Sequence, residues 1–266
     1  MSSVAFYVTA HQDDWELFRG YQAYVDIEQT PADTKIVFIY TTAGDAGRED
    51  DYWERRELGA LRAQACALNR MQQPNNYHLL PDVFIANGHQ IARFQQARVV
   101  KEPIKVVSYH MRLPDGHKLE SLQNLHQNGQ PITAIGQPTT TYTSWNDFCS
   151  TVGAILEHET AQTTSPNPWV NAADWNEQYN PEDHVDHRET ALALQAVYQA
   201  TNNKFHRAWF RTYCTRGLPM NMDGARLMRK RAVYTEYASE AGDEAQEWAD
   251  YGPKDYCRTV PAGQSE

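Results

Sequence analysis

A short apolar run near the start of the chain, residues 4–10, constrains the fold more than any other stretch. It is rich in strand-forming residues and predicts a buried β-strand. The run ends abruptly in His11, Gln12, Asp13 and Asp14, a polar group that includes residue types that bind metals. In an open parallel α/β sheet, ligands bind where the strands end. The sequence therefore predicts a buried strand that carries a metal-binding type of cluster at its carboxyl end.

A second cluster of the same chemical kind lies far along the chain, where residues 183–187 include Asp183, His184, Asp186 and His187. The simplest account is that folding brings the two clusters into one site. Zinc in a hydrolase typically has three protein ligands from histidine, aspartate or glutamate, together with a water. Two histidines and one carboxylate meet that requirement. Because successive residues leaving a strand point in different directions, one aspartate of the first cluster would bind metal and the other would accept a proton.

Strands and helices alternate along the first part of the chain. A second apolar run, residues 35–42, leads into a tight loop over residues 43–47. Asp50 and Asp51 offer N-caps for a helix whose apolar residues recur at three- and four-residue intervals. This alternation predicts an α/β fold, a three-layer sandwich with a mostly parallel sheet. Further helices are expected over residues 15–27, from Ser144, over 187–199 with Asp183 as the cap, and over 223–238, and further strands over 77–80, 104–109, 169–172 and 208–214.

The length of 266 residues suits one domain with a large core, so we expect a single α/β domain over residues 1–266. The segment from about residue 111 to 143 is mostly polar, contains several glycines and prolines, and shows little periodicity. So long an irregular segment in a compact domain commonly forms a rim or lid of a functional site. The tail after Gly252 shows no readable order.

The charge balance limits the partners of the chain. With 24 Lys and Arg against 34 Asp and Glu, the formal net charge is −10, and the sequence offers no broad basic surface for nucleic acid. The four cysteines lie far apart without a CxxC pair, as is typical of reduced thiols. No run of about 18 apolar residues predicts a membrane span. Residues 1–3 lack the features of a secretion signal, so we expect a cytoplasmic protein, or a secreted one if a signal peptide has been removed.

The two clusters match the motifs of a known family. Residues 11–16, HQDDWE, resemble the A-H-P-D-D-x-E signature of the PIG-L or LmbE-like metal-dependent N-deacetylases, and residues 184–187, HVDH, resemble their later H-x-D-H signature. Residues 41–45 and 55–57 resemble the next strand end and helix start of that family. The resemblance covers roughly the first seventy residues and residues 170–200. It implies a Rossmann-like fold and the removal of acetyl or acyl groups from amino sugars.

Carried over position by position, the resemblance implies a role for each residue of the clusters. The metal ligands implied are His11, Asp14 and His187. Asp13 would be the general base, His184 would stabilise the oxyanion or act as an acid, and Asp186 would orient a histidine. The metal implied is Zn²⁺, with Fe²⁺ as the alternative. The sequence departs from the family at Gln12, where proline is usual, and at residues 18–20, where a glycine-rich turn is usual, so these positions leave the identity of the substrate open.

Four further residues are candidates for contact with a substrate. They are Trp15, Arg56, His110 and Arg112. The expected reaction is metal-dependent hydrolysis of an N-acetyl or N-acyl group on an amino sugar or a small molecule that contains one, with no nucleic-acid or membrane partner. The alternatives are an amidase acting on a thiol conjugate or an antibiotic, and a catalytically inactive sugar-binding protein. Asp13 speaks against the latter because a binding protein needs no free base, and a dehydrogenase is disfavoured because no G-x-G-x-x-G follows the first strand.

Overall fold

One large β-sheet organises the fold. The structure, a computed structural model, describes residues 1–29, 34–71, 77–116, 121–242 and 245–265. Within these ranges eight strands form the sheet in the spatial order β10-β9-β8-β1-β2-β5-β4-β3, and β6 and β7 form a separate small sheet. The strands are β1 (Ser3–Thr9), β2 (Thr34–Thr42), β3 (His78–Ala86), β4 (His89–Ala97), β5 (Val106–Leu113), β6 (Ile132–Thr133), β7 (Thr141–Tyr142), β8 (Trp169–Ala173), β9 (His206–Phe210) and β10 (Cys257–Val260).

The centre of the sheet is parallel. β1 pairs in parallel with β2 and β8, and the pairs β2–β5 and β8–β9 are parallel as well. Phe6 of β1 shows the register, because it lies between Val37 of β2 and Val170 of β8. The outer strands β10, β4 and β3 are antiparallel to their neighbours. This mostly parallel sheet confirms the predicted α/β fold class.

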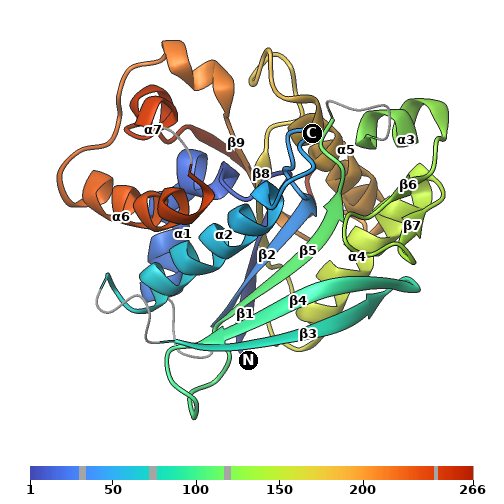
Figure 1. The fold of residues 1–266 in the computed structure, drawn as a ribbon, viewed down its shortest axis with the longest axis horizontal. Coiled ribbons are helices and arrows are strands. Elements are labelled where there is room, and N and C mark those ends of the chain that lie inside the picture. Colours follow the sequence, from blue (N-terminus) through green and yellow to red (C-terminus); the bar gives the residue numbers. More distant parts are fainter. Residues whose placement is uncertain (30–33, 72–76, 117–120, 243–244, 266) are drawn as a thin grey trace.

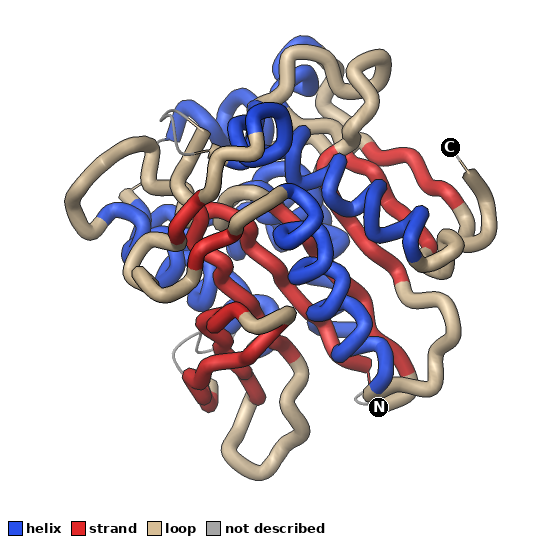
Figure 2. Tube along the Cα trace, turned by 90° about the vertical axis from the view of Figure 1, so that its right-hand side faces the viewer, coloured by secondary structure: helices blue, strands red, loops and turns tan. Residues whose placement is uncertain are grey.

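Helices cover both faces of the sheet and complete a three-layer sandwich (Figure 1). They are α1 (Asp14–Gln29), α2 (Tyr52–Leu68), α3 (Leu122–Asn128), α4 (Trp145–Ala161), α5 (Val185–Ala200), the 3₁₀ helix η1 (Tyr213–Gly217), α6 (Gly224–Ala241) and α7 (Ala245–Tyr251). α1, α2 and α6 pack together on one face, and α3, α4 and α5 pack together on the other. Figure 2 shows helices over the strands in a view turned by 90°. Within the described ranges, no helix combines the length and apolar character needed to cross a bilayer.

The apolar run that opens the chain is buried on both faces. Because successive side chains of a strand point to opposite faces, Phe6 and Val8 belong to the core beneath α4 and α5, whereas Tyr7 belongs to the core beneath α1, α2 and α6. A polar side chain at any of these positions would lose its contact with water. For this reason β1 reads as a continuous apolar run and not as an alternating one.

The prediction for the segment that follows α2 is confirmed only in part. The strand expected over residues 77–80 is the start of the longer β3, which forms an antiparallel hairpin with β4 at one edge of the sheet. Its apolar pattern was misleading because Val83 and Ile85 are each 57% exposed and do not mark a buried face. Pro81 is tolerated within β3 because an edge strand can lack a hydrogen-bond donor on its outer side.

The segment predicted to be an irregular rim has more order than expected. It contains α3 and the β6–β7 sheet, while residues 117–120 lie outside the described ranges. Leu122, Leu125 and Ile132 are fully buried in the core beneath α4 and α5, so the segment packs onto the domain. The tail after Gly252 is also more ordered than predicted, because β10 extends the sheet beside β9.

Two boundaries near the second cluster also differ from the prediction. β9 ends at Phe210, earlier than the expected residue 214, because the chain turns into η1. The N-cap of α5 is His184 and not Asp183: His184 Nδ1 accepts a hydrogen bond from the amide of Asp186 at 3.3 Å. Asp183 instead accepts a hydrogen bond from the amide of His184 at 2.8 Å.

The strand order changes direction between β1 and β8. From β1 the chain continues to β2 and β5 on one side, and it later returns to β8 and β9 on the other side. In open α/β sheets, such a switch point leaves a crevice at the carboxyl ends of the two strands, and ligands bind there. The segments that follow β1 and β8 carry the two polar clusters, so the fold places both clusters at this point.

Candidate metal centre

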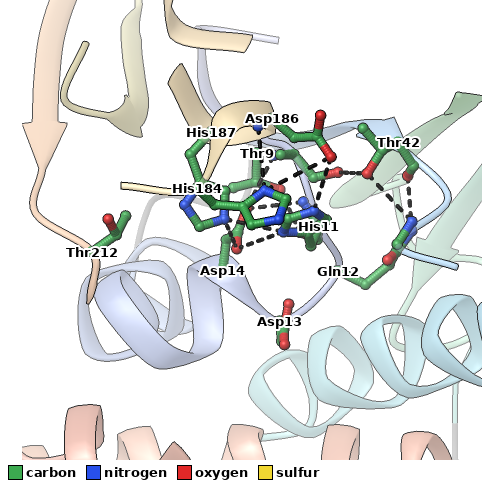
Figure 3. A network of polar contacts seen from close by, with 12 residues as sticks. Thr9, His11, Gln12, Asp13, Asp14, Thr42, His184, Asp186, His187 and Thr212 are labelled. Atoms are coloured by element: carbon green, nitrogen blue, oxygen red, sulfur yellow. Dashed lines mark hydrogen bonds and ion pairs between the residues drawn. The ribbon is translucent and has the colours of Figure 1, made fainter. Parts of the chain in front are cut away.

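The two polar clusters meet at the carboxyl ends of β1 and β8. His11 and Asp14 lie in the turn from β1 to α1, and residues 183–187 lead into α5. Figure 3 shows His11, Asp14, His184 and His187 directed toward one another. The prediction that folding joins the clusters is therefore confirmed.

Asp14 is held in place by the backbone at the start of α1. Its Oδ2 accepts hydrogen bonds from the amides of Ala10 at 3.0 Å and His11 at 2.9 Å. These two amides belong to the turn that precedes α1, and their hydrogen bonds fix the orientation of the carboxylate. The other oxygen, Oδ1, lies 2.8 Å from Nε2 of His187. Local hydrogen bonds therefore direct one oxygen of Asp14 at the second cluster.

Three possible ligand atoms converge in a buried space. Nδ1 of His11 lies 3.0 Å from Nε2 of His187. Together with Asp14, these residues form a group whose ligand atoms all lie within 4.8 Å of one another, and all three residues are buried. Two imidazole nitrogens and a carboxylate oxygen are a donor set that suits zinc or ferrous iron. This group is the ligand set that the family resemblance implied.

The carboxylates around His11 and His187 favour positive charge at this site. Burial alone would lower the pKa of a histidine. Hydrogen bonds with Asp14 and Asp186 nevertheless raise the pKa of His11 to about 9. Asp14 and Asp183 likewise outweigh burial and raise the pKa of His187 well above its ordinary value. Protons on the two rings therefore compensate the carboxylates, and a divalent metal would compete with those protons.

One residue of the segment that was predicted to be an irregular rim also belongs to the site. Asp115 follows β5, and its Oδ2 lies 3.6 Å from Nε2 of His11, while Oδ2 of Asp186 lies 3.5 Å from the same nitrogen. With His184 they form a second group of possible ligand atoms within 4.8 Å. Oδ1 of Asp115 and Oδ1 of Asp186 are buried and have no hydrogen-bond partner among the described residues. The signal that could have found Asp115 is its place after a strand at the same sheet edge.

His184 is the neutral histidine of the site. Burial, together with His11 and His187 nearby, lowers the pKa of His184 to about 4. Its Nδ1 accepts the hydrogen bond from the amide of Asp186. A neutral imidazole that accepts through Nδ1 carries its proton on Nε2. His184 can therefore donate one hydrogen bond from Nε2, which lies 3.8 Å from Asp115 Oδ1.

Asp13 lies apart from the converging ligand atoms, as Figure 3 shows. Its Oδ1 accepts a hydrogen bond from Nη2 of Arg56, a residue of α2. Arg56 also donates to the carbonyl oxygen of Gly44 at 2.9 Å and to the hydroxyl of Tyr237 at 2.8 Å. Arg56 was predicted to contact a substrate, but the structure leaves only 6% of it exposed. It serves as the buried partner of Asp13.

Replacing Arg56 with methionine should destabilise the fold by about 3–5 kcal/mol, the usual cost of leaving a buried carboxylate without its cation. The free energy of unfolding in urea measures this loss. Arg62→Met in the same helix is the matched control, because Arg62 pairs with Glu240 at a more exposed position and should cost about 0–1 kcal/mol. Equal losses in the two variants would contradict the account of the Asp13–Arg56 pair.

Gln12, where the family usually has proline, connects the turn after β1 to the end of β2. Its side-chain amide donates to the carbonyl oxygen of Thr42 at 3.1 Å. Gly44 has a φ of +61°, and a Cβ there would lie 2.7 Å from Gln12 and 2.8 Å from Arg56. This crowding requires glycine at position 44. Gln12 is fully buried, and its hydrogen bond holds the turn after β1 against the end of β2.

The remaining candidates for substrate contact have partners within the protein. Trp15 is fully buried, and its indole N–H donates to the hydroxyl of Tyr40 at 3.0 Å. His110 is also fully buried and lies 3.3 Å from Glu57. Both side chains are covered by other residues of the protein, so contact of Trp15 and His110 with a substrate stays a prediction. Arg112 binds Glu57 through hydrogen bonds of 2.7 and 2.8 Å, but its side chain remains 16% exposed.

Comparisons with known proteins find similar structures. No protein-family model matches the chain, and no curated protein matches it. N,N'-diacetylchitobiose deacetylase from Pyrococcus horikoshii is 14% identical, with a TM-score of 0.53 over 98% of this chain and 84% of that one. A deacetylase of the teicoplanin biosynthesis pathway is 11% identical, with a TM-score of 0.50 over 97% and 96%. GalB, the 4-carboxy-2-hydroxymuconate hydratase from Pseudomonas putida KT2440, is 10% identical, with a TM-score of 0.48 over 100% and 99%.

The two deacetylases share the fold of this chain over nearly its whole length. Identities of 14% and 11% establish the fold and not the reaction, because one fold can host different activities. The fold and the site together define a class: an α/β protein with the fold of the LmbE-like deacetylases and a buried histidine and aspartate candidate metal site. The structural match therefore agrees with the resemblance seen in the sequence.

Proposed function

We propose that the protein is a metal-dependent hydrolase that removes an N-acetyl or N-acyl group from an amino sugar or a small molecule containing one. The observation that carries the proposal is the convergence of His11, Asp14 and His187 at the switch point of the sheet. A neutral histidine, His184, has its ring centroid 4.8 Å from that of His11. A second carboxylate, Asp13, lies in the same turn as His11 and Asp14 but apart from the converging ligand atoms. Amide hydrolysis needs these same components: a metal, a proton acceptor and an oxyanion donor.

The residues present fit a divalent metal. His11, Asp14 and His187 would hold Zn²⁺ or, as the alternative, Fe²⁺, because two imidazoles and one carboxylate are a usual ligand set of catalytic sites. When bound, such a metal would supply Lewis acidity and lower the pKa of a coordinated water toward about 7. Nε2 of His11 lies 3.5 Å from Asp186, a carboxylate that would orient the ring for binding through Nδ1.

The other residues handle protons and charge. Asp13 accepts a proton from the attacking water and passes it to the departing amine. Arg56 favours the ionised form of Asp13, because a buried cation beside a carboxylate stabilises its negative charge. His184 donates from Nε2 to the oxygen of the amide as negative charge develops there. Asp186 contributes through its backbone amide, whose hydrogen bond to Nδ1 fixes the position of the proton on His184.

Tyr213, which contacts a proposed metal ligand, also borders a surface cavity that would offer space for the rest of a substrate. Tyr213 has its ring centroid 5.3 Å from that of His187. The same tyrosine lines a surface cavity of about 760 Å³, which Tyr251 and Gln246 also border. A cavity of this size accommodates a molecule as large as a disaccharide. The diacetylchitobiose deacetylase with the same fold supports an N-acetylated amino sugar as the substrate.

An amidase acting on an antibiotic or a thiol conjugate is the second candidate. It is favoured by the deacetylase of teicoplanin biosynthesis, which shares the fold. The same catalytic groups would serve either substrate, so the choice depends on the walls of the cavity. Gln12 and residues 18–20, where the sequence departs from the family pattern, neither line this cavity nor belong to the proposed ligands.

A substrate panel tests the proposal. Zinc-loaded protein is incubated with N-acetylglucosamine, diacetylchitobiose, an N-acylated glycopeptide and an N-acetylated thiol conjugate, and the released primary amine is measured. We expect release from an amino sugar. Release only from the glycopeptide or the thiol conjugate would favour the second candidate. A protein that binds zinc but releases amine from none of them would contradict both.

A further inference from the structure

We propose that Asp183 is a positioning residue that fixes the tautomer and orientation of His187, and that Thr212 and Asn180 hold Asp183 in place. The inference rests on the proposed function in one respect, because it takes His187 as a metal ligand. The sequence pattern suggested only a helix cap for Asp183. In the structure its carboxylate makes a direct contact with the ring of His187.

The two nitrogens of His187 have different partners. Nδ1 lies 2.7 Å from Oδ1 of Asp183, and Nε2 faces Asp14 and His11 at 2.8 and 3.0 Å. Because an ionised carboxylate can only accept hydrogen bonds, it requires the proton of the neutral ring to be on Nδ1. The lone pair of Nε2 is then directed at the place where the other two proposed ligands converge. A carboxylate behind a metal-binding histidine is a known way to fix the ring and increase its basicity.

The carboxylate of Asp183 is itself held from two parts of the chain. Its Oδ1 also accepts hydrogen bonds from the amide of His184 at 2.8 Å and from the hydroxyl of Thr212, the residue that precedes η1. Its Oδ2 accepts from the side-chain amide of Asn180 at 2.7 Å. The Asn180 oxygen in turn accepts from the amide of Thr212 at 3.0 Å. The carboxylate of Asp183 thus connects the loop before α5 to the chain after β9.

Burial makes this arrangement rigid. The side chain of Asp183 is 5% exposed, and Asn180 and Thr212 are 2% and 0% exposed. Several hydrogen-bond donors in a buried place fix the position of a carboxylate. A cap of α5 would need only the contact with the amide of His184. The additional contacts with Thr212 and Asn180 hold the carboxylate of Asp183 beside Nδ1 of His187.

The test measures zinc affinity and does not depend on activity. The dissociation constant of Zn²⁺ is determined on the metal-free full chain by competition with a chromophoric chelator. Asp183→Asn, which retains an acceptor but loses the charge, should weaken zinc binding by about tenfold to a hundredfold. Thr212→Val should weaken zinc binding to a smaller extent.

The matched control is Glu177→Gln. Glu177 is an exposed carboxylate in the same loop, paired with Arg188, and its loss should leave zinc affinity unchanged. Urea midpoints show that each variant is folded, and Thr212→Val decides the question if Asp183→Asn does not fold. Wild-type affinity in the folded variants, or an equal loss in Glu177→Gln, would overturn the inference. Tight zinc binding without amide hydrolysis by the parent would contradict the proposed function alone, whereas no zinc binding would contradict both.

Discussion

Replacing His187 with alanine is expected to remove metal binding and amide hydrolysis together. The side chain supplies one of the three proposed ligand atoms, and its Nε2 lies between His11 and Asp14. A site with only two protein ligands no longer provides the usual set for catalytic zinc. Metal analysis beside steady-state kinetics measures both losses in one preparation.

His184→Ala is the comparison that separates the loss of a metal ligand from the loss of an oxyanion donor. His184 lies three positions earlier but carries its proton on Nε2 and donates to the developing oxyanion in the proposed mechanism. The variant should keep its metal and lose about a hundredfold to a thousandfold in turnover, the scale of a lost oxyanion donor. Equal metal loss in both variants would make His184 a ligand. Unchanged turnover in His184→Ala would reduce it to the N-cap of α5.

Replacing Asp13 with asparagine should lower turnover by about a hundredfold or more while the metal content stays near one per chain. Asparagine still accepts the hydrogen bond from Arg56, but it cannot take a proton from water. Asp50→Asn, at an exposed residue paired with Arg48, is the control and should have full activity. Loss of metal from Asp13→Asn would show that Asp13 and Asp14 have exchanged roles.

The central part of the fold could be predicted because it follows from local sequence. β1 and β2 are covered on both faces, so their sequences are continuous apolar runs that are easily recognised. The metal-binding residue types follow β1 directly and precede α5 directly. A parallel sheet then brings such segments to one edge, and the order of the strands decides which of them become neighbours.

Contacts between distant segments could not be predicted in this way. Arg56 lies on α2 and meets Asp13 only after the helix packs against the sheet. Asp115 follows a Pro in a turn-forming sequence, and this local pattern hid its position beside His11. Asp183 was read as a cap because capping depends on neighbours in sequence, whereas its contact with Thr212 depends on the approach of β9.

The edge of the sheet was missed for a different reason. Strands β3 and β4 are partly exposed, and their apolar residues are not confined to a buried face of the sheet. Strand propensity and apolar periodicity predict a strand poorly where its side chains are not buried in the folded protein. Since this hairpin lies at the far edge from β1 and β8, the error does not affect the candidate metal centre.

The central claim is that a metal held by His11, Asp14 and His187 is required for hydrolysis of an N-acyl amide. Release of primary amine from an N-acetylated amino sugar tests it most directly, measured before chelation, after dialysis against a strong chelator, and after zinc is added back. The account predicts that chelation abolishes release and that one equivalent of zinc restores it. Full activity in a sample shown to be free of metal would contradict it.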